Sequence, residues 1–206
     1  MSDPPRIRTP EEVPGFIVEL VRSYVPFDYG GAKFKEVCRD YVMPYGTTCG
    51  FLPIWALWRA GCRDPKFINR TDPDSGLIYK NGANLARLWN KGHPPFEPYV
   101  ADMTFTPGDI LYIYDGLDGA GHNPNTEHVF IYLDSEVDEV DGKTYMISAD
   151  AGQTNAKGQQ AAKILKRLWN GRSIGKNADR KIVGRLSPSK LTYVAESSLS
   201  LPDTEQ

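Results

Sequence analysis

The second half of the chain carries short apolar segments, rich in β-branched and aromatic residues, that are separated by Gly, Asp and Asn. This pattern is typical of strands joined by turns. It predicts antiparallel strands at residues 109–114, 128–133 and 144–148, with one more at 181–186. Residues 161–169 fit a short helix and a strand equally well.

The first half of the chain places its apolar residues at helical spacing. Residues 16–21 suit a short helix, residues 32–42 repeat apolar positions at intervals of three and four, and residues 51–58 are apolar throughout. A polar segment without periodicity at 63–83 predicts a long surface loop. Helices followed by strands predict an α+β fold, with N-terminal helices packed on a C-terminal antiparallel sheet.

Composition favours one domain, because 206 residues with 40% apolar and 24% charged side chains can bury a sizeable core. We expect an extended, proline-containing lead-in at 1–15, a single domain at 16–186 and a polar tail at 187–206. The formal charge of -2 and the lack of a Lys/Arg cluster predict no nucleic-acid partner. No apolar run approaches the ~20 residues of a spanning helix, so membrane insertion is not expected.

One cysteine stands where turn residues give way to the apolar segment at 51–58. Thr48 and Gly50 are turn and capping types, so Cys49 is expected at or just before a helix N-terminus. The partial positive charge of the unpaired N–H groups there favours a thiolate. Pro53 requires that this helix either begin near Leu52 or have an open first turn. Cys49 is therefore the candidate nucleophile.

The other cysteines, Cys38 and Cys62, form no Cys-x-x-Cys motif with each other or with Cys49. This spacing argues against a zinc finger and against a dithiol redox site. Reduced thiols are the favoured state, and a disulfide between Cys38 and Cys62 remains the alternative. No metal and no cofactor are expected.

A nucleophilic thiol needs a base, and the chain has three histidines to supply one. His93 and His122 lie in segments expected to be loops, whereas His128 opens a predicted strand, where sheet hydrogen bonding holds the side chain near an open edge. His128 is therefore the candidate base. A histidine that only caps a strand is the alternative.

The base in turn needs a group that orients its ring. Ser148 and Asp150 have the same parity on the next strand, and Gln153 follows in a glycine-containing turn. Asp150 is preferred because a charged acceptor makes the stronger hydrogen bond to a cationic ring. Ser148 and Gln153 stay open as the third residue.

The order of these parts resembles a known family. Residues 47–51 with the helix up to Gly61, the Pro-Gly-Asp turn at 107–109 and the strand that starts at His128 look like the NlpC-type and CHAP-type cysteine amidases of the papain-like superfamily. The resemblance covers roughly residues 41–153. It implies a papain-like fold with the nucleophile at a helix N-terminus, and a cysteine amidase or endopeptidase that acts on peptide bonds of peptidoglycan.

On this interpretation the reaction is acyl transfer, in which Cys49 attacks an amide carbonyl and His128 protonates the leaving amine. The backbone N–H of Cys49 and one side-chain donor would stabilise the oxyanion, and Tyr45 is the candidate donor. An aromatic ring packed under the turn is an equally good interpretation of Tyr45.

Two other functions remain open. A transglutaminase-like acyltransferase also orders its parts as cysteine, histidine and aspartate, with the last two on adjacent strands. A non-catalytic binding module with a papain-like fold would keep Cys49 as a small buried hydrophobe.

The N-terminal residues show no secretory signal, so we expect the protein to be cytoplasmic as synthesised. A wall-cutting enzyme without a signal fits an effector delivered to the periplasm of a target cell by type VI secretion, and such an effector implies an immunity protein as partner. A phage-derived lysin and an intracellular enzyme that acts on another amide are the alternatives.

Overall fold

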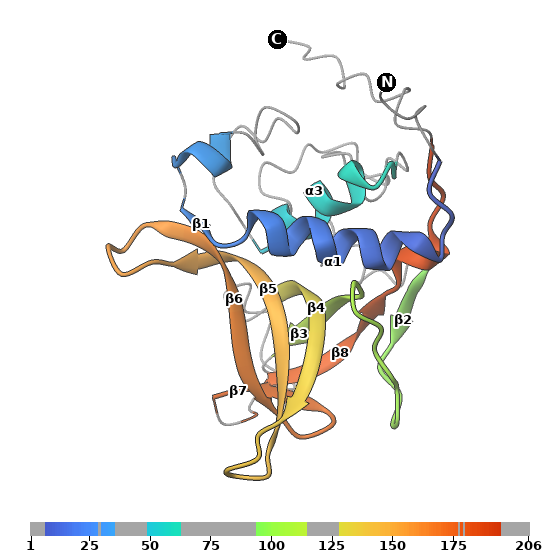
Figure 1. Cartoon of the computed structure of the whole chain (residues 1–206). Coiled ribbons are helices and arrows are strands. Elements are labelled where there is room, and N and C mark those ends of the chain that lie inside the picture. Colours follow the sequence, from blue (N-terminus) through green and yellow to red (C-terminus); the bar gives the residue numbers. More distant parts are fainter. Residues whose placement is uncertain are drawn as a thin grey trace, which may run out of the picture.

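The computed structural model describes residues 7–28, 30–35, 49–62, 94–114, 128–176, 178 and 180–194. The main feature of the described chain is a set of strands that form a closed antiparallel barrel (Figure 1). The barrel strands are β3 (Ile110–Tyr114), β4 (His128–Val137), β5 (Thr144–Thr154), β6 (Gln160–Trp169), β7 (Ser173–Gly175) and β8 (Arg180–Leu186). Two short strands extend the sheet: β1 (Phe27–Asp28) pairs with β6, and β2 (Phe96–Pro98) pairs with β8.

The expected α+β, papain-like arrangement of helices on a sheet is wrong, because the described chain is mostly β and its six main strands close on themselves. Closure depends on β7, which pairs with β6 on one side and with β8 on the other. Three residues of sequence Ser-Ile-Gly are too few to show the alternation by which a strand is recognised. Without β7, the remaining strands read as an open sheet.

Both faces of the barrel wall are covered at β3 and at the start of β4. Leu111, Ile113, Phe130 and Tyr132 belong to an apolar cluster inside the barrel, together with residues of β5, β7 and β8. Their neighbours Ile110, Tyr112, Val129 and Ile131 face the other way and join the core beneath the helices. Strands covered on both faces carry continuous apolar runs, which explains why the first six residues of β4 are all buried.

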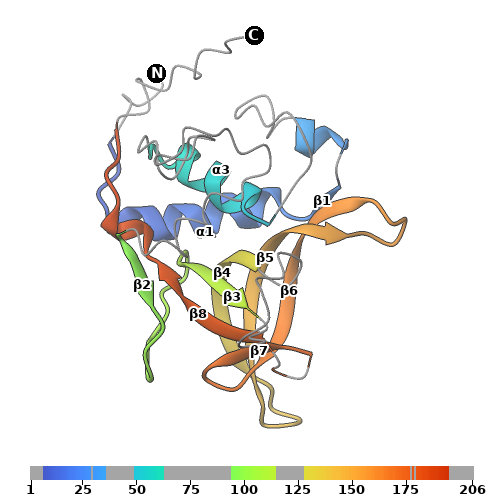
Figure 2. The ribbon, with the colours of Figure 1, turned by 180° about the vertical axis from the view of Figure 1, so that it is seen from behind.

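Two helices, α1 (Glu12–Tyr24) and α3 (Phe51–Arg59), pack together on one side of the barrel, as the two opposite views show (Figures 1 and 2). The rings of Tyr24 and Trp55 meet edge to face, with their centroids 5.1 Å apart. Helix α3 ends at Arg59 with Ala60 as its C-cap, and Gly61 follows with φ of +99°. The N–H groups of Gly61 and Cys62 bond to the carbonyls of Trp58 and Leu57. This is a Schellman motif, which satisfies the last carbonyls of the helix.

The Pro-Gly-Asp turn before β3 packs directly against α1. Gly108 has φ of +101°, and a Cβ atom there would lie 2.6 Å from the carbonyl oxygen of Pro14. Only glycine fits this contact, both because of its φ and because of the close approach. The turn therefore fixes the distance between α1 and the start of β3.

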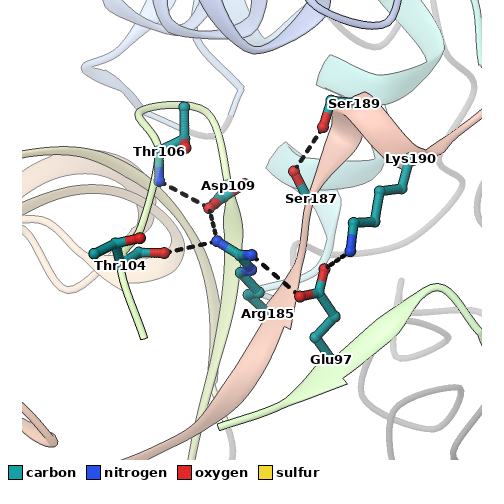
Figure 3. A network of polar contacts seen from close by, with 8 residues as sticks. All are labelled: Glu97, Thr104, Thr106, Asp109, Arg185, Ser187, Ser189 and Lys190. Carbon is teal, nitrogen blue, oxygen red and sulfur yellow. Dashed lines mark hydrogen bonds and ion pairs between the residues drawn. The ribbon is translucent and has the colours of Figure 1, made fainter. Parts of the chain in front are cut away.

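A network of charged groups anchors the same turn (Figure 3). Asp109 is fully buried, accepts a hydrogen bond from the Thr106 N–H at 2.9 Å and pairs with Arg185 of β8 at 3.3 Å. Arg185 also contacts Glu97 at 3.1 Å, and Glu97 in turn contacts Lys190 at 2.5 Å. Burial raises the pKa of Asp109, although the bonds from Thr106 and Arg185 oppose the rise. The network ties β2, β8 and the turn together.

The segment after β8 packs on the core rather than leaving it. A 3₁₀ helix, η1 (Pro188–Lys190), is followed by Leu191 and Tyr193, which are both buried, and Tyr193 forms an isolated bridge with Cys62. Cys38 and the loop expected at 63–83 lie outside the described residues. No helix within the described ranges is long and apolar enough to cross a lipid bilayer.

Candidate active site

Three elements bring Cys49, His128 and Asp150 together. Cys49 lies directly before the N-cap residue of α3, His128 is the first residue of β4, and Asp150 lies on β5, which pairs with β4. Helix α3 packs against both strands. The side chains that the sequence predicts as nucleophile, base and orienting acid therefore meet at one place.

The helix after the cysteine begins at Phe51, so that Pro53 is its third residue. An N–H group in the first turn has no partner within the helix, and Pro53 therefore removes no hydrogen bond. The Gly50 carbonyl accepts the first bond of the helix, from the N–H of Ile54 at 3.1 Å. Cys49 is thus held next to the positive end of the helix dipole.

His128 and Asp150 form a short, buried contact. Nε2 of His128 lies 2.5 Å from Oδ1 of Asp150, and the two residues are 8% and 0% exposed. Because Nε2 faces the carboxylate, Nδ1 is the nitrogen left to face the thiol. Burial opposes a charged ring, but the bonds to Asp150 and Cys49 prevail and raise the pKa of His128 to about 9.

Cys49 is half-buried and hydrogen-bonded to His128. Burial alone would raise the pKa of its thiol. The hydrogen bond and the positive charge of His128, together with the N–H groups of Val129 and Gly50, outweigh burial and lower the pKa of Cys49. A thiolate next to an imidazolium is the reactive form of a nucleophilic cysteine.

Two further side chains hold Asp150 in place. Arg167 of β6 donates to both carboxylate oxygens, with Nη2 at 2.6 Å from Oδ1 and Nη1 at 3.0 Å from Oδ2. The Ser148 hydroxyl donates to Oδ2 at 2.7 Å and accepts from Nη1 of Arg167 at 2.5 Å. Burial would raise the pKa of Asp150, but the bonds to His128 and Arg167 lower it to about 2.

The alternatives for the third residue are now distinguished by their contacts. Asp150 contacts Nε2 of His128, whereas Ser148 contacts the carboxylate of Asp150. Gln153 lies further along β5, past a shift in the strand register that follows Asp150. Tyr45, the candidate oxyanion donor, and the other two histidines lie outside the described residues.

Sequence reasoning missed Arg167. Its segment was ambiguous between helix and strand, and an arginine on a strand ordinarily faces solvent. No local signal could have found it, because Arg167 faces Asp150 only through the register of the two strands, in which it pairs with Met146, an inward-facing residue of the strand that carries Asp150.

The arrangement suits nucleophilic chemistry. Among the residues described, no group of three His, Cys, Asp or Glu side chains is placed to hold a metal ion. Cys49, His128 and Asp150 are residues of the types that serve as nucleophile, base and orienting acid in acyl transfer.

No protein-family model matches the chain, and no curated protein or solved structure shows significant similarity to it.

Proposed function

We propose that this protein is a cysteine hydrolase that cleaves an amide or peptide bond through an acyl-enzyme intermediate. The observation that carries the proposal is the place of His128, which lies 2.5 Å from Asp150 and lowers the pKa of the neighbouring Cys49 thiol. Such a chain of contacts serves the same reaction on unrelated folds. The proposal therefore depends on three side chains and not on the arrangement of helices and strands around them.

In the proposed reaction, the Cys49 thiolate attacks the carbonyl carbon and the carbonyl oxygen becomes negatively charged. The imidazolium of His128 then gives its proton to the leaving amine, so that the C–N bond breaks and a thioester remains. His128, now neutral, takes a proton from water, and the resulting attack on the thioester releases the acid and restores the thiol. Asp150 keeps the ring oriented and stabilises its charge at each stage.

Peptidoglycan is the proposed source of the amide. This choice rests on the order of the cysteine, the Pro-Gly-Asp turn and the histidine, which resembles the NlpC-type and CHAP-type amidases. Delivery to the periplasm of a target cell as a secreted effector, with an immunity protein that blocks the site, is the biological setting we propose for such an enzyme.

The test is digestion of purified peptidoglycan by the wild type and by Cys49→Ala, with the released fragments identified by mass. We expect new amino and carboxyl ends with the wild type alone, and their masses identify the bond. Absence of fragments from both proteins would reject peptidoglycan as the substrate. Fragments from both proteins would reject Cys49 as the nucleophile.

The same digestion distinguishes a hydrolase from an acyltransferase, because both reactions pass through a thioester. When a primary amine is added in excess, a transglutaminase-like enzyme joins it to the acyl group and a hydrolase does not. We expect products that carry a free carboxylate, with no mass increase from the amine. Incorporation of the amine would replace the hydrolase proposal with the acyltransferase.

A further inference from the structure

Asp150 is bound more tightly than orientation of a histidine alone requires. Its carboxylate is fully buried and contacts His128, Ser148 and both terminal nitrogens of Arg167. The paired contacts to Arg167 are the fork geometry in which a guanidinium binds a carboxylate most strongly. Arg167 therefore determines which way the two oxygens point.

The four ionisable groups of the site alternate in charge. In the reactive state Cys49 is negative, His128 positive, Asp150 negative and Arg167 positive, so that the charges sum to zero. Without Arg167 the same state would leave one net negative charge in a largely buried place, which is unfavourable. The guanidinium thus balances a site that would otherwise favour protonation of one of its anions.

One aromatic ring supports both cations. The ring of His128 stacks on Phe130 with centroids 6.1 Å apart, and the guanidinium carbon of Arg167 lies 5.5 Å from the centroid of the same ring. Phe130 is fully buried inside the barrel. The imidazole and the guanidinium therefore lie against the same buried ring, and both contact Asp150.

We propose that Arg167 is a positioning residue, which fixes the Asp150 carboxylate in its ionised form with Oδ1 toward His128 and so activates Cys49 from the far side of the barrel wall. This role rests on the proposed function, because it matters to catalysis only if Cys49 is the nucleophile. Its test is nevertheless independent of any substrate.

The experiment measures how fast iodoacetamide alkylates Cys49 as a function of pH, followed by the mass of the peptide that contains Cys49. The variants are Arg167→Met, which removes the charge and the fork, and Arg167→Lys, which keeps the charge but cannot bind both oxygens in the same plane. For Arg167→Met we expect alkylation at pH 7 to fall about tenfold, the size of one lost hydrogen bond to a charged group. We expect Arg167→Lys to fall between Arg167→Met and the wild type.

The pH profile of Arg167→Lys separates positioning from a simple charge effect. If Arg167 positions Asp150, its removal loosens the carboxylate, the imidazolium loses support, and the midpoint of alkylation moves to higher pH. A simple charge effect has the same sign, because loss of a nearby positive charge also disfavours the thiolate, but in that case Arg167→Lys, which keeps the charge, would retain the wild-type profile. An unchanged profile or a shift to lower pH would overturn the proposal.

Two control variants test whether the effect belongs to the site. Lys166→Met removes a cation from the adjacent position of β6, where Lys166 pairs with exposed Glu136 instead of Asp150. Arg185→Met breaks another pair between an arginine and a buried aspartate, in the network that joins β2, β8 and the turn before β3. Both should keep the wild-type alkylation profile, and a loss in either would overturn the assignment to Arg167.

If Arg167→Met fails to fold, Arg167→Lys decides the question alone, since it leaves the buried charges balanced. A wild-type profile in Arg167→Lys would then overturn the fork as the positioning device. The outcome is separable from that of the proposed function: a shifted profile in a protein that cleaves no amide supports the role of Arg167 and rejects the reaction. If the wild type cleaves an amide but the Arg167 variants keep the wild-type alkylation profile, the reaction is supported and the role of Arg167 is rejected.

Discussion

Oδ1 of Asp150 lies 2.5 Å from Nε2 of His128, on two neighbouring strands of a closed barrel. The contact turns the other edge of the imidazole toward Cys49, which precedes a helix packed on the same two strands. The position of the nucleophile relative to its base is therefore set by how α3 packs on the barrel wall.

Replacing Asp150 with Asn should impair both catalysis and folding. The amide has no charge to stabilise the imidazolium, and we expect activity to fall by about 10²- to 10⁴-fold. Arg167 would lose its carboxylate partner, so the free energy of unfolding should drop by about 3 kcal/mol. Denaturant unfolding and an activity assay measure the two effects.

Ser148→Ala is the matched control for this variant, because Ser148 contacts the same carboxylate through a neutral hydroxyl. Its loss should cost about 1 kcal/mol of unfolding free energy and leave most of the activity. Equal losses of activity in Asp150→Asn and Ser148→Ala would mean that the charge of Asp150 has no special role.

The pH dependence of the reaction follows from the paired shifts of Cys49 and His128. The pKa of Cys49 is lowered, so the thiolate forms at a lower pH than in an ordinary cysteine. The pKa of His128 is raised to about 9, so the imidazolium that protonates the leaving amine persists until the pH passes that value. Initial rates should therefore hold through neutral pH and decline near pH 9. A decline centred near the ordinary histidine pKa would mean that Asp150 and Cys49 do not stabilise the charged ring.

Gly108→Ala should strongly destabilise the protein without touching the site. The new Cβ would press on the backbone of Pro14, and φ of +101° is unfavourable for any residue with a side chain. We expect the free energy of unfolding to fall by about 2 kcal/mol or more.

The control is Gly15→Ala, one residue along the same helix from Pro14. A Cβ atom at Gly15 would have no neighbour within 4 Å, and alanine favours the helix by about 0.5–1 kcal/mol. The two substitutions should therefore change the unfolding free energy in opposite directions. Similar effects at both positions would contradict the close contact between the turn and α1.

Arg185→Met should destabilise the barrel while Lys190→Met should not. Arg185 is mostly buried and pairs with Asp109 and Glu97, so its removal should cost about 3 kcal/mol. Lys190 is 49% exposed and contacts only the Glu97 end of the network, where a surface ion pair contributes about 1 kcal/mol or less. If thermal unfolding shows that the two variants lose similar amounts of stability, Arg185 contributes no more than a surface ion pair.

The sequence revealed the strands of this fold better than their closure. The apolar run at the start of β4 was recognisable, and so was the helix that ends before Gly61, since local composition determines both. The barrel was not, because its closure depends on the three residues of β7 and on long-range pairing that leaves no local pattern. A continuous apolar run in β4 did carry the information that both faces of that strand are covered.

The candidate site, too, could be predicted only in part from the sequence. Asp150 could be chosen from the two-residue period of a strand and the strength of a charged acceptor. Arg167 could not, because its contact with Asp150 needs the register between β5 and β6, which their sequences do not specify.

The central claim, that His128 activates Cys49, is tested most directly by the rate at which iodoacetamide alkylates each cysteine at pH 7 in the wild type and in His128→Gln. Cys62, which is fully buried, is the internal reference. We predict that Cys49 reacts much faster than Cys62 in the wild type and slows by about tenfold or more in His128→Gln, as expected when a thiolate loses its cationic partner. If Cys49 reacts as slowly as Cys62, or at the same rate in both proteins, the cysteine is not an activated nucleophile and the account is wrong.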